Sequence, residues 1–216
     1  MPFMKVDAVA SEVSSGPKIV YVVDDHSEMR RSLHFLLSTL QIRAWPFVSG
    51  SDFLEQQPHL SPAPILLDMR MSGMDGFEVL TELDRRAVDW PVVLMTGHGD
   101  VVTAVRAMKL GAIEFLEKPF EAEALEIALT NAFQIEERNQ GARLRKADAR
   151  RRLDQLTPRE TEVIGCLVQG QPNKLVAHRL GLSPRTIEMH RANAFQKLGA
   201  RSIAEVVTLA ASLDDR

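Results

Sequence analysis

Short apolar runs that stop abruptly at polar residues are the feature that most limits what this chain can fold into. The run at residues 19–23, rich in β-branched side chains, ends at Asp24 and Asp25. It does not alternate apolar and polar residues, which is typical of a strand buried on both faces of a parallel sheet. Similar runs follow at residues 65–67 and 92–95, and weaker ones at 42–48 and 113–116. The pattern predicts five strands.

Amphipathic segments separate these runs. Apolar residues recur at helical spacing over residues 27–40, 75–87, 100–109 and 120–137. Strands that alternate with helices imply right-handed crossovers, so we expect an α/β domain with a doubly wound parallel sheet. Such sheets bind ligands beyond the carboxyl ends of their strands.

Polar residues stand at the expected strand ends, at Asp24, Asp25, Asp68, Thr96 and Lys118. Parallel strands end at one edge, so these side chains should converge. Three adjacent carboxylates repel one another unless a cation joins them, and Mg²⁺ is the natural candidate. A carboxylate in such a site can attack phosphorus, and Asp68, alone on the central strand, is the best candidate. The alternative is that these residues only cap helices.

Charge is distributed unevenly along the chain. Residues 1–135 hold 11 Lys and Arg against 19 Asp and Glu, residues 136–152 hold 7 against 3, and residues 153–216 hold 8 against 7. The acidic front part would repel nucleic acid, so any DNA contact is expected in the back part. The sequence has no apolar run of membrane-spanning length, and a single cysteine, Cys166, fits a reducing cytoplasm. We therefore expect a cytoplasmic protein with no membrane partner.

Four ordered motifs in the front part resemble the receiver domain of two-component response regulators, which has a flavodoxin-like fold. They are Val22-Val23-Asp24-Asp25, the segment 67–76 beginning Leu67-Asp68, the segment 95–100 beginning Met95-Thr96, and the segment 115–120 containing Lys118-Pro119. The resemblance implies that Asp68 is the phosphoacceptor and that Asp25, Asp68 and the backbone carbonyl of Arg70 bind Mg²⁺ directly. It also implies that Asp24 acts on the metal through water, and that Lys118 pairs with the phosphate.

The same resemblance implies a conformational switch. Thr96 and Phe115 would form the switch pair, the Lys118-Pro119 bond would be cis, and His98 would influence dephosphorylation. Phe115 has no hydroxyl, so its switching would rest on ring burial alone. The family usually has proline where Ser72 stands, from which we expect a more mobile loop.

The back part has a purely helical pattern. Thr157-Pro158-Arg159-Glu160 is a capping box with proline at the first helical position. Glycine and proline then delimit a helix ending at Gly170, a short one over 173–181, one over 183–198 and one over 202–212. Four short helices with a tight glycine turn before the third match an all-α, four-helix helix-turn-helix domain.

One stripe of the helix from Ser183 is polar and is predicted to read bases. Glu188 can accept from cytosine N4, Met189 can contact a thymine methyl, and Ala192 lies on the same stripe. The opposite stripe is apolar and should face the core, so an ordinary solvated amphipathic helix is the alternative. Candidate phosphate contacts are Lys174, Arg185, Thr186, Arg191 and Lys197.

Segments at 156–160, 173–174, 182–191 and 197–202 resemble the LuxR-type helix-turn-helix, and the combination with a receiver resembles the NarL/FixJ architecture, closest to the FixJ branch. We therefore expect a flexible leader over 1–17, a receiver over 18–137 and a LuxR-type domain over 153–216. Residues 138–152 would be a basic, helical linker with a break near Gly141. It either touches nothing or extends the DNA contact.

The sequence thus predicts a transcriptional regulator, not an enzyme, that is activated by phosphorylation. Its expected partners are a sensor histidine kinase, promoter DNA, RNA polymerase and a second copy in a phosphorylation-dependent homodimer. One alternative is an Mg²⁺-dependent phosphohydrolase with an aspartyl-phosphate intermediate, but Arg70 and His26 stand where its second Asp would be. The other alternative is a dimeric DNA-binding protein that works without phosphorylation.

Overall fold

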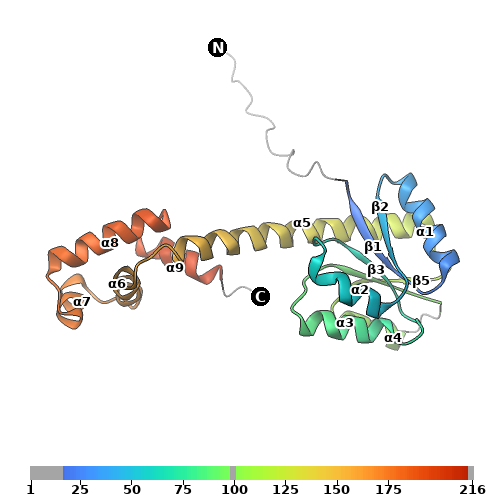
Figure 1. Cartoon of the computed structure of the whole chain (residues 1–216), viewed down its shortest axis with the longest axis horizontal. Coiled ribbons are helices and arrows are strands. Elements are labelled where there is room, and N and C mark those ends of the chain that lie inside the picture. Colours follow the sequence, from blue (N-terminus) through green and yellow to red (C-terminus); the bar gives the residue numbers. More distant parts are fainter. Residues whose placement is uncertain (1–16, 98–100, 214–216) are drawn as a thin grey trace, which may run out of the picture. The chain divides into compact units, whose positions relative to one another are not determined.

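The computed structural model describes residues 17–97 and 101–213, in two compact units that divide after Asn139 (Figure 1). The predicted leader, except Pro17, and His98 lie outside the described residues. The first unit contains β1 (Ile19–Val23), α1 (Ser27–Thr39), β2 (Arg43–Phe47), α2 (Gly50–Gln56), a 3-10 turn (Gln57–His59), β3 (Ile65–Asp68), α3 (Gly76–Arg85), β4 (Val92–Thr96), α4 (Val101–Lys109), β5 (Ala112–Glu117) and the start of α5 (Ala122–Leu153). Among the described residues, no helix has the length and apolarity that crossing a membrane requires.

The five strands form one parallel sheet in the order β2-β1-β3-β4-β5, which confirms the flavodoxin-like, doubly wound fold. β3 is the central strand. In the sheet register, Asp68 at the end of β3 pairs with Met95, and Thr96 at the end of β4 pairs with Glu117. The predicted site residues therefore reach the same edge of the sheet.

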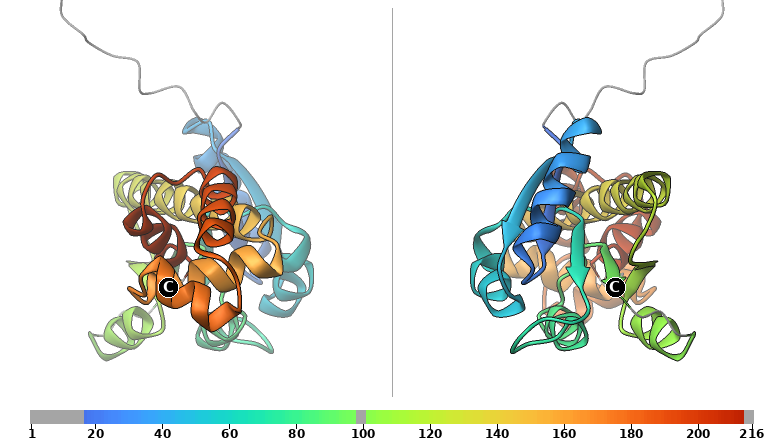
Figure 2. Two further views of the ribbon diagram at one scale, coloured as in Figure 1. Left: turned by 90° about the vertical axis from the view of Figure 1, so that its left-hand side faces the viewer. Right: turned by 90° about the vertical axis from the view of Figure 1, so that its right-hand side faces the viewer.

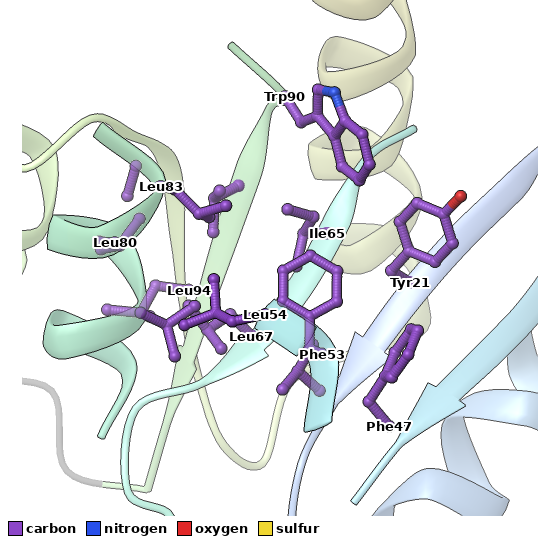
Figure 3. Close-up of a cluster of buried hydrophobic side chains, with 14 of the residues drawn as sticks. Tyr21, Phe47, Phe53, Leu54, Ile65, Leu67, Leu80, Leu83, Trp90 and Leu94 are labelled. Atoms are coloured by element: carbon purple, nitrogen blue, oxygen red, sulfur yellow. The ribbon is translucent and has the colours of Figure 1, made fainter. Parts of the chain in front are cut away.

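Helices cover both faces of this sheet. On one face, α1 and α5 pack against side chains such as Val22, Leu66 and Val93. On the other face, α2, α3 and α4 cover a cluster that contains four packed rings, Tyr21, Phe47, Phe53 and Trp90 (Figure 3). Burial on both faces explains why the strands read as continuous apolar runs.

The second unit contains α6 (Pro158–Val168), α7 (Asn173–Leu180), α8 (Pro184–Leu198) and α9 (Ile203–Ala211), the orange to red helices of Figure 2. Their apolar side chains form a third buried cluster. The Thr157–Glu160 capping box is present as predicted. Gly181 and Gly199 end α7 and α8 in the left-handed region, at φ 65° and 64°, where a Cβ would be strained. The four predicted helices are confirmed.

The basic segment before α6 differs from the prediction. α5 runs to Leu153 without a break at Gly141, so the predicted interruption is wrong. The segment is also not a spacer without contacts: Leu153 packs against the apolar cluster of the second unit, and Arg152 Nη1 donates to the carbonyl of Leu198 at 3.2 Å. Asp148 in turn holds Arg152 at 2.7 Å. The end of α5 thereby caps the last turn of α8.

Candidate functional site

Three carboxylates and an imidazole meet where β1 and β3 end. Each of Asp24, Asp25, His26 and Asp68 offers a ligand atom, and these atoms lie within 4.8 Å of one another. Asp24 is fully buried and Asp68 nearly so, whereas the imidazole of His26 is largely exposed. The sheet edge thus collects several negative charges in a space where water screens them poorly.

Lys118 joins two of these carboxylates. Its Nζ donates to Asp24 Oδ2 at 2.8 Å and to Asp68 Oδ1 at 2.9 Å. The lysine is positioned by its backbone N–H, which donates to the Thr96 carbonyl at 2.6 Å, and by a cis Lys118-Pro119 bond, as predicted. Burial works to lower the pKa of Lys118, but the two carboxylates outweigh it and raise the pKa. Burial, with the neighbouring acidic charges, raises the pKa of Asp68 despite this contact.

Asp25 is held by a different partner. Its Oδ2 accepts hydrogen bonds from the backbone N–H and the Oγ of Ser72, both at 2.8 Å. The Ser72 N–H is the main reason why the pKa of Asp25 is lowered. Its Oδ1 is buried and receives no hydrogen bond from the residues that the structure describes. That oxygen lies 2.8 Å from His26 Nδ1, so the imidazole is the neighbour of Asp25 Oδ1.

The acidic cluster opens into a pocket of about 620 Å³. Asp68, Lys118, His26 and the exposed Arg70 are among its lining residues. Gly76 starts α3, and a Cβ at this position would lie 2.7 Å from the Asp68 carbonyl oxygen. Only glycine allows α3 to begin this close to the end of β3.

The two predicted switch residues have different surroundings. Thr96 is fully buried at the end of β4. Phe115, in β5, is half-buried and packs against the aromatic cluster of the first unit. A half-buried ring has room to become more buried, which the predicted switch requires.

The donor set of this cluster suits a hard divalent cation. Asp25 and Asp68 supply carboxylate oxygens, and Asp25 Oδ1 is a buried oxygen that accepts no hydrogen bond from the described residues, with His26 Nδ1 2.8 Å away. Mg²⁺ prefers a few carboxylates with water in its remaining positions. The residues present therefore fit the metal that the sequence predicts.

The polar stripe of α8 is exposed as predicted. Glu188, Met189 and Ala192 are exposed, and Arg185 begins the same stripe. On the opposite side Ile187 and other apolar residues enter the core of the second unit. Thr186 belongs to the helix start, since its N–H donates to the Ser183 cap at 3.1 Å. The arrangement leaves one face of α8 free for a ligand.

The predicted phosphate contacts are not equivalent. Lys174, at the start of α7, is exposed, and Arg191 lies over the Phe195 ring at 5.1 Å. Lys197 instead donates to the carboxylate of Glu160 at 2.7 Å. Glu160 is 3% exposed and also accepts from the Thr157 N–H, so this ion pair links α8 to the capping box of α6. Its main partner, Lys197, lowers the pKa of Glu160.

Comparison with known proteins shows the family to which the chain belongs. The model described as the response regulator receiver domain matches residues 20–130, which is half of the chain, and that of bacterial regulatory proteins of the luxR family matches residues 154–210. The chain belongs to the response regulators. The transcriptional regulatory protein FixJ of Bradyrhizobium diazoefficiens is 42% identical over 191 residues, covering 88% of this response regulator and 93% of that protein. FixJ of Azorhizobium caulinodans is 44% identical over 195 residues, covering 88% and 90%.

Solved structures agree with this placement of the response regulator. The response regulator StyR aligns with a TM-score of 0.77 at 38% identity, covering 91% of this chain and 99% of that one. Full-length FixJ from B. japonicum aligns with a TM-score of 0.56 at 41% identity, covering 91% and 97%. The predicted NarL/FixJ-type combination of a receiver and a LuxR-type domain is confirmed.

Sequence reasoning missed several contacts of this response regulator. It did not place His26 in the acidic cluster, and it did not find the Lys197–Glu160 pair or the Arg152 cap. A departure from the family pattern did mark Ser72, but the expected consequence, a more mobile loop, is opposed by its two hydrogen bonds. The other contacts join residues that are 37 and 46 positions apart, which no local pattern reports.

Proposed function

We propose that Asp68 accepts a phosphoryl group from a sensor histidine kinase and that this reaction controls dimerisation and promoter binding. A carboxylate oxygen of Asp68 attacks the phosphorus of a phosphohistidine, the new P–O bond replaces the P–N bond, and the released imidazole takes up a proton. The observation that carries the proposal is that Asp68 combines three features: it ends the central strand, contacts Lys118 at 2.9 Å and lines an open pocket.

Asp25, Asp68 and the backbone carbonyl of Arg70 would hold Mg²⁺, with Asp24 acting through water. The ion would neutralise charge on the oxygens of the transferring phosphoryl group. The hydrogen bonds from Ser72 lower the pKa of Asp25, which favours the ionised carboxylate that a metal ligand needs. Asp24 differs from Asp25 in that its Oδ2 accepts a hydrogen bond from Lys118.

Phosphorylation would act through three neighbours of Asp68. Lys118 would pair with the phosphoryl oxygens, Thr96 would donate its hydroxyl to them, and Phe115 would move inward. The driving free energy is the difference between the contacts that the phosphorylated and unphosphorylated states make. His98, outside the described residues, would tune the lifetime of the phosphoryl group.

The surface that responds would be that of α4 and β5. α4 exposes Val101, Val102, Val105 and Met108, at 80%, 79%, 47% and 50%. Such an apolar face on one helix favours association with another protein surface, and we propose a second phosphorylated copy. The dimer would place two α8 helices on half-sites about one helical turn apart.

The chain would work in the cytoplasm as a regulator rather than an enzyme. We propose the division into a receiver over 18–137, a helical linker over 138–152 and a DNA-binding domain over 153–216. RNA polymerase would be the partner of the DNA-bound form. On DNA, Glu188, Met189 and Ala192 would face base edges, while Lys174, Arg185, Thr186 and Arg191 would contact phosphates.

Selection of binding sites from random duplex DNA tests this function. Phosphorylated and unphosphorylated protein are compared, and the oligomeric state of each is measured in parallel. We expect a two-half-site sequence to be enriched by a phosphorylated dimer. Equal enrichment by unphosphorylated protein would favour the phosphorylation-independent reading instead.

Replacing Glu188 by Ala should change the preferred base without changing the salt slope of binding. The carboxylate offers an acceptor to a base edge and makes no phosphate contact, so its loss relaxes preference at one position by about 1–3 kcal/mol. Site selection and salt titration measure the two effects. Glu162→Ala is the matched control, because it removes an exposed carboxylate of α6 that pairs with Arg159. An identical preferred site in both variants would exclude base reading by Glu188.

Lys174→Met and Lys197→Met should have opposite signatures. Lys174 is exposed, and its replacement should lower the salt slope of DNA binding by about 1, because one phosphate contact is lost. Lys197 pairs with the buried Glu160, so its removal should leave the slope unchanged and lower the free energy of unfolding by about 1 kcal/mol. Salt titration and urea unfolding measure both quantities. A lowered slope in Lys197→Met would restore that residue to the phosphate contacts.

A further inference from the structure

Ser72 makes the two hydrogen bonds that orient Asp25. Its backbone N–H and its Oγ both donate to Asp25 Oδ2 at 2.8 Å, across 47 positions of the sequence. Ser72 lies in the loop between β3 and α3, and Asp25 follows β1. The pair therefore ties this loop to a residue of the acidic cluster.

The two oxygens of Asp25 are used differently. Oδ2 is occupied by both donors of Ser72, whereas Oδ1 is buried, accepts no hydrogen bond from the described part of the chain and has His26 Nδ1 as a neighbour at 2.8 Å. A carboxylate held through one oxygen cannot rotate freely, so the other oxygen keeps its direction. Asp25 thereby keeps a fixed position in the cluster that it forms with Asp24, His26 and Asp68.

We propose that Ser72 is a positioning residue for the divalent cation, because its two hydrogen bonds to Oδ2 fix the Asp25 carboxylate within the acidic cluster. The inference rests on the proposed Mg²⁺ site. A ligand that is already oriented loses less conformational freedom when the ion binds. The lowered pKa of Asp25, caused first by the Ser72 N–H, is consistent with a ligand kept ionised.

Substitutions at position 72 can retain both donors to Asp25 Oδ2, only the backbone donor, or neither. Ser72→Thr keeps both the N–H and a hydroxyl. Ser72→Ala keeps only the N–H, and Ser72→Pro keeps neither, because proline has no N–H. The variants thus form a series with two, one and no donors to Asp25 Oδ2.

Calorimetric titration of the unphosphorylated full chain with MgCl₂ tests the series. Loss of a hydrogen bond to a metal ligand commonly weakens metal binding by about 10-fold or more. We expect a Kd about 10-fold higher for Ser72→Ala, up to about 100-fold higher for Ser72→Pro, and within about 2-fold of the original for Ser72→Thr. The rescue by threonine distinguishes orientation of Asp25 from a general effect of changing the loop.

Ser49→Ala is the control for stability. It removes the cap of α2, whose Oγ accepts from the Asp52 N–H, and should lower the unfolding temperature while leaving the Mg²⁺ Kd unchanged. Ser72→Ala and Ser72→Pro that bind Mg²⁺ as tightly as the original chain would overturn the inference. If Ser72→Pro does not fold, Ser72→Ala decides. An original chain that binds no Mg²⁺ would instead overturn the proposed metal site itself, which separates the two failures.

Discussion

Asp68→Asn is expected to give no phosphoprotein with a phosphorylated histidine kinase domain. An amide oxygen is a far weaker nucleophile than a carboxylate, and the amide cannot form the acyl phosphate. The substitution keeps the shape of the side chain at the end of β3, so the buried strand and the pocket it lines should persist. Transfer of labelled phosphate, read by intact mass, measures the loss.

The control for this substitution is Asp84→Asn, which changes an exposed carboxylate of α3. It alters the net charge by the same amount and should leave the phosphoprotein yield unchanged. A yield in Asp68→Asn equal to that of the original chain would move the acceptor to another residue of the cluster. Asp24 and Asp25 would then be the candidates, since both share the cluster with Asp68.

Lys118→Met is expected to lower the free energy of unfolding by about 3 kcal/mol in a buffer that contains a chelator. The ammonium is 15% exposed and contacts both Asp24 and Asp68, which are 0% and 5% exposed as side chains. Its removal leaves two buried carboxylates facing each other without a cation, and the methionine supplies no donor. Urea unfolding measures the difference.

Two further variants separate charge pairing from side-chain packing. Lys109→Met removes an exposed lysine at the end of α4 and should change stability by no more than about 0.5 kcal/mol. Adding Asp24→Asn to Lys118→Met removes one of the opposed charges, and we expect it to recover part of the loss. A stability of Lys118→Met within about 0.5 kcal/mol of the original would show that the pairing contributes little.

Most residues of the acidic cluster at the end of the sheet could be predicted from the sequence. Apolar runs at β1, β3 and β5 predicted strands of one parallel sheet, whose ends must meet, so Asp24, Asp68 and Lys118 were expected together. The structure places them within hydrogen-bonding distance. The helix ends of the second unit were predictable for a similar reason, because capping boxes and left-handed glycines act within a few residues.

Local patterning by itself determined the fold class, the two-part organisation and the set of residues at the sheet edge, because periodicity and end signals depend on near neighbours along the chain. Tertiary structure alone decided which polar groups pair: Ser72 with Asp25, Lys197 with Glu160, and Arg152 with the end of α8. A hydrogen bond forms only when two atoms lie within about 3 Å in a suitable direction. Periodicity reports whether a side chain is buried, and it contains no information about distances between residues that are far apart in sequence.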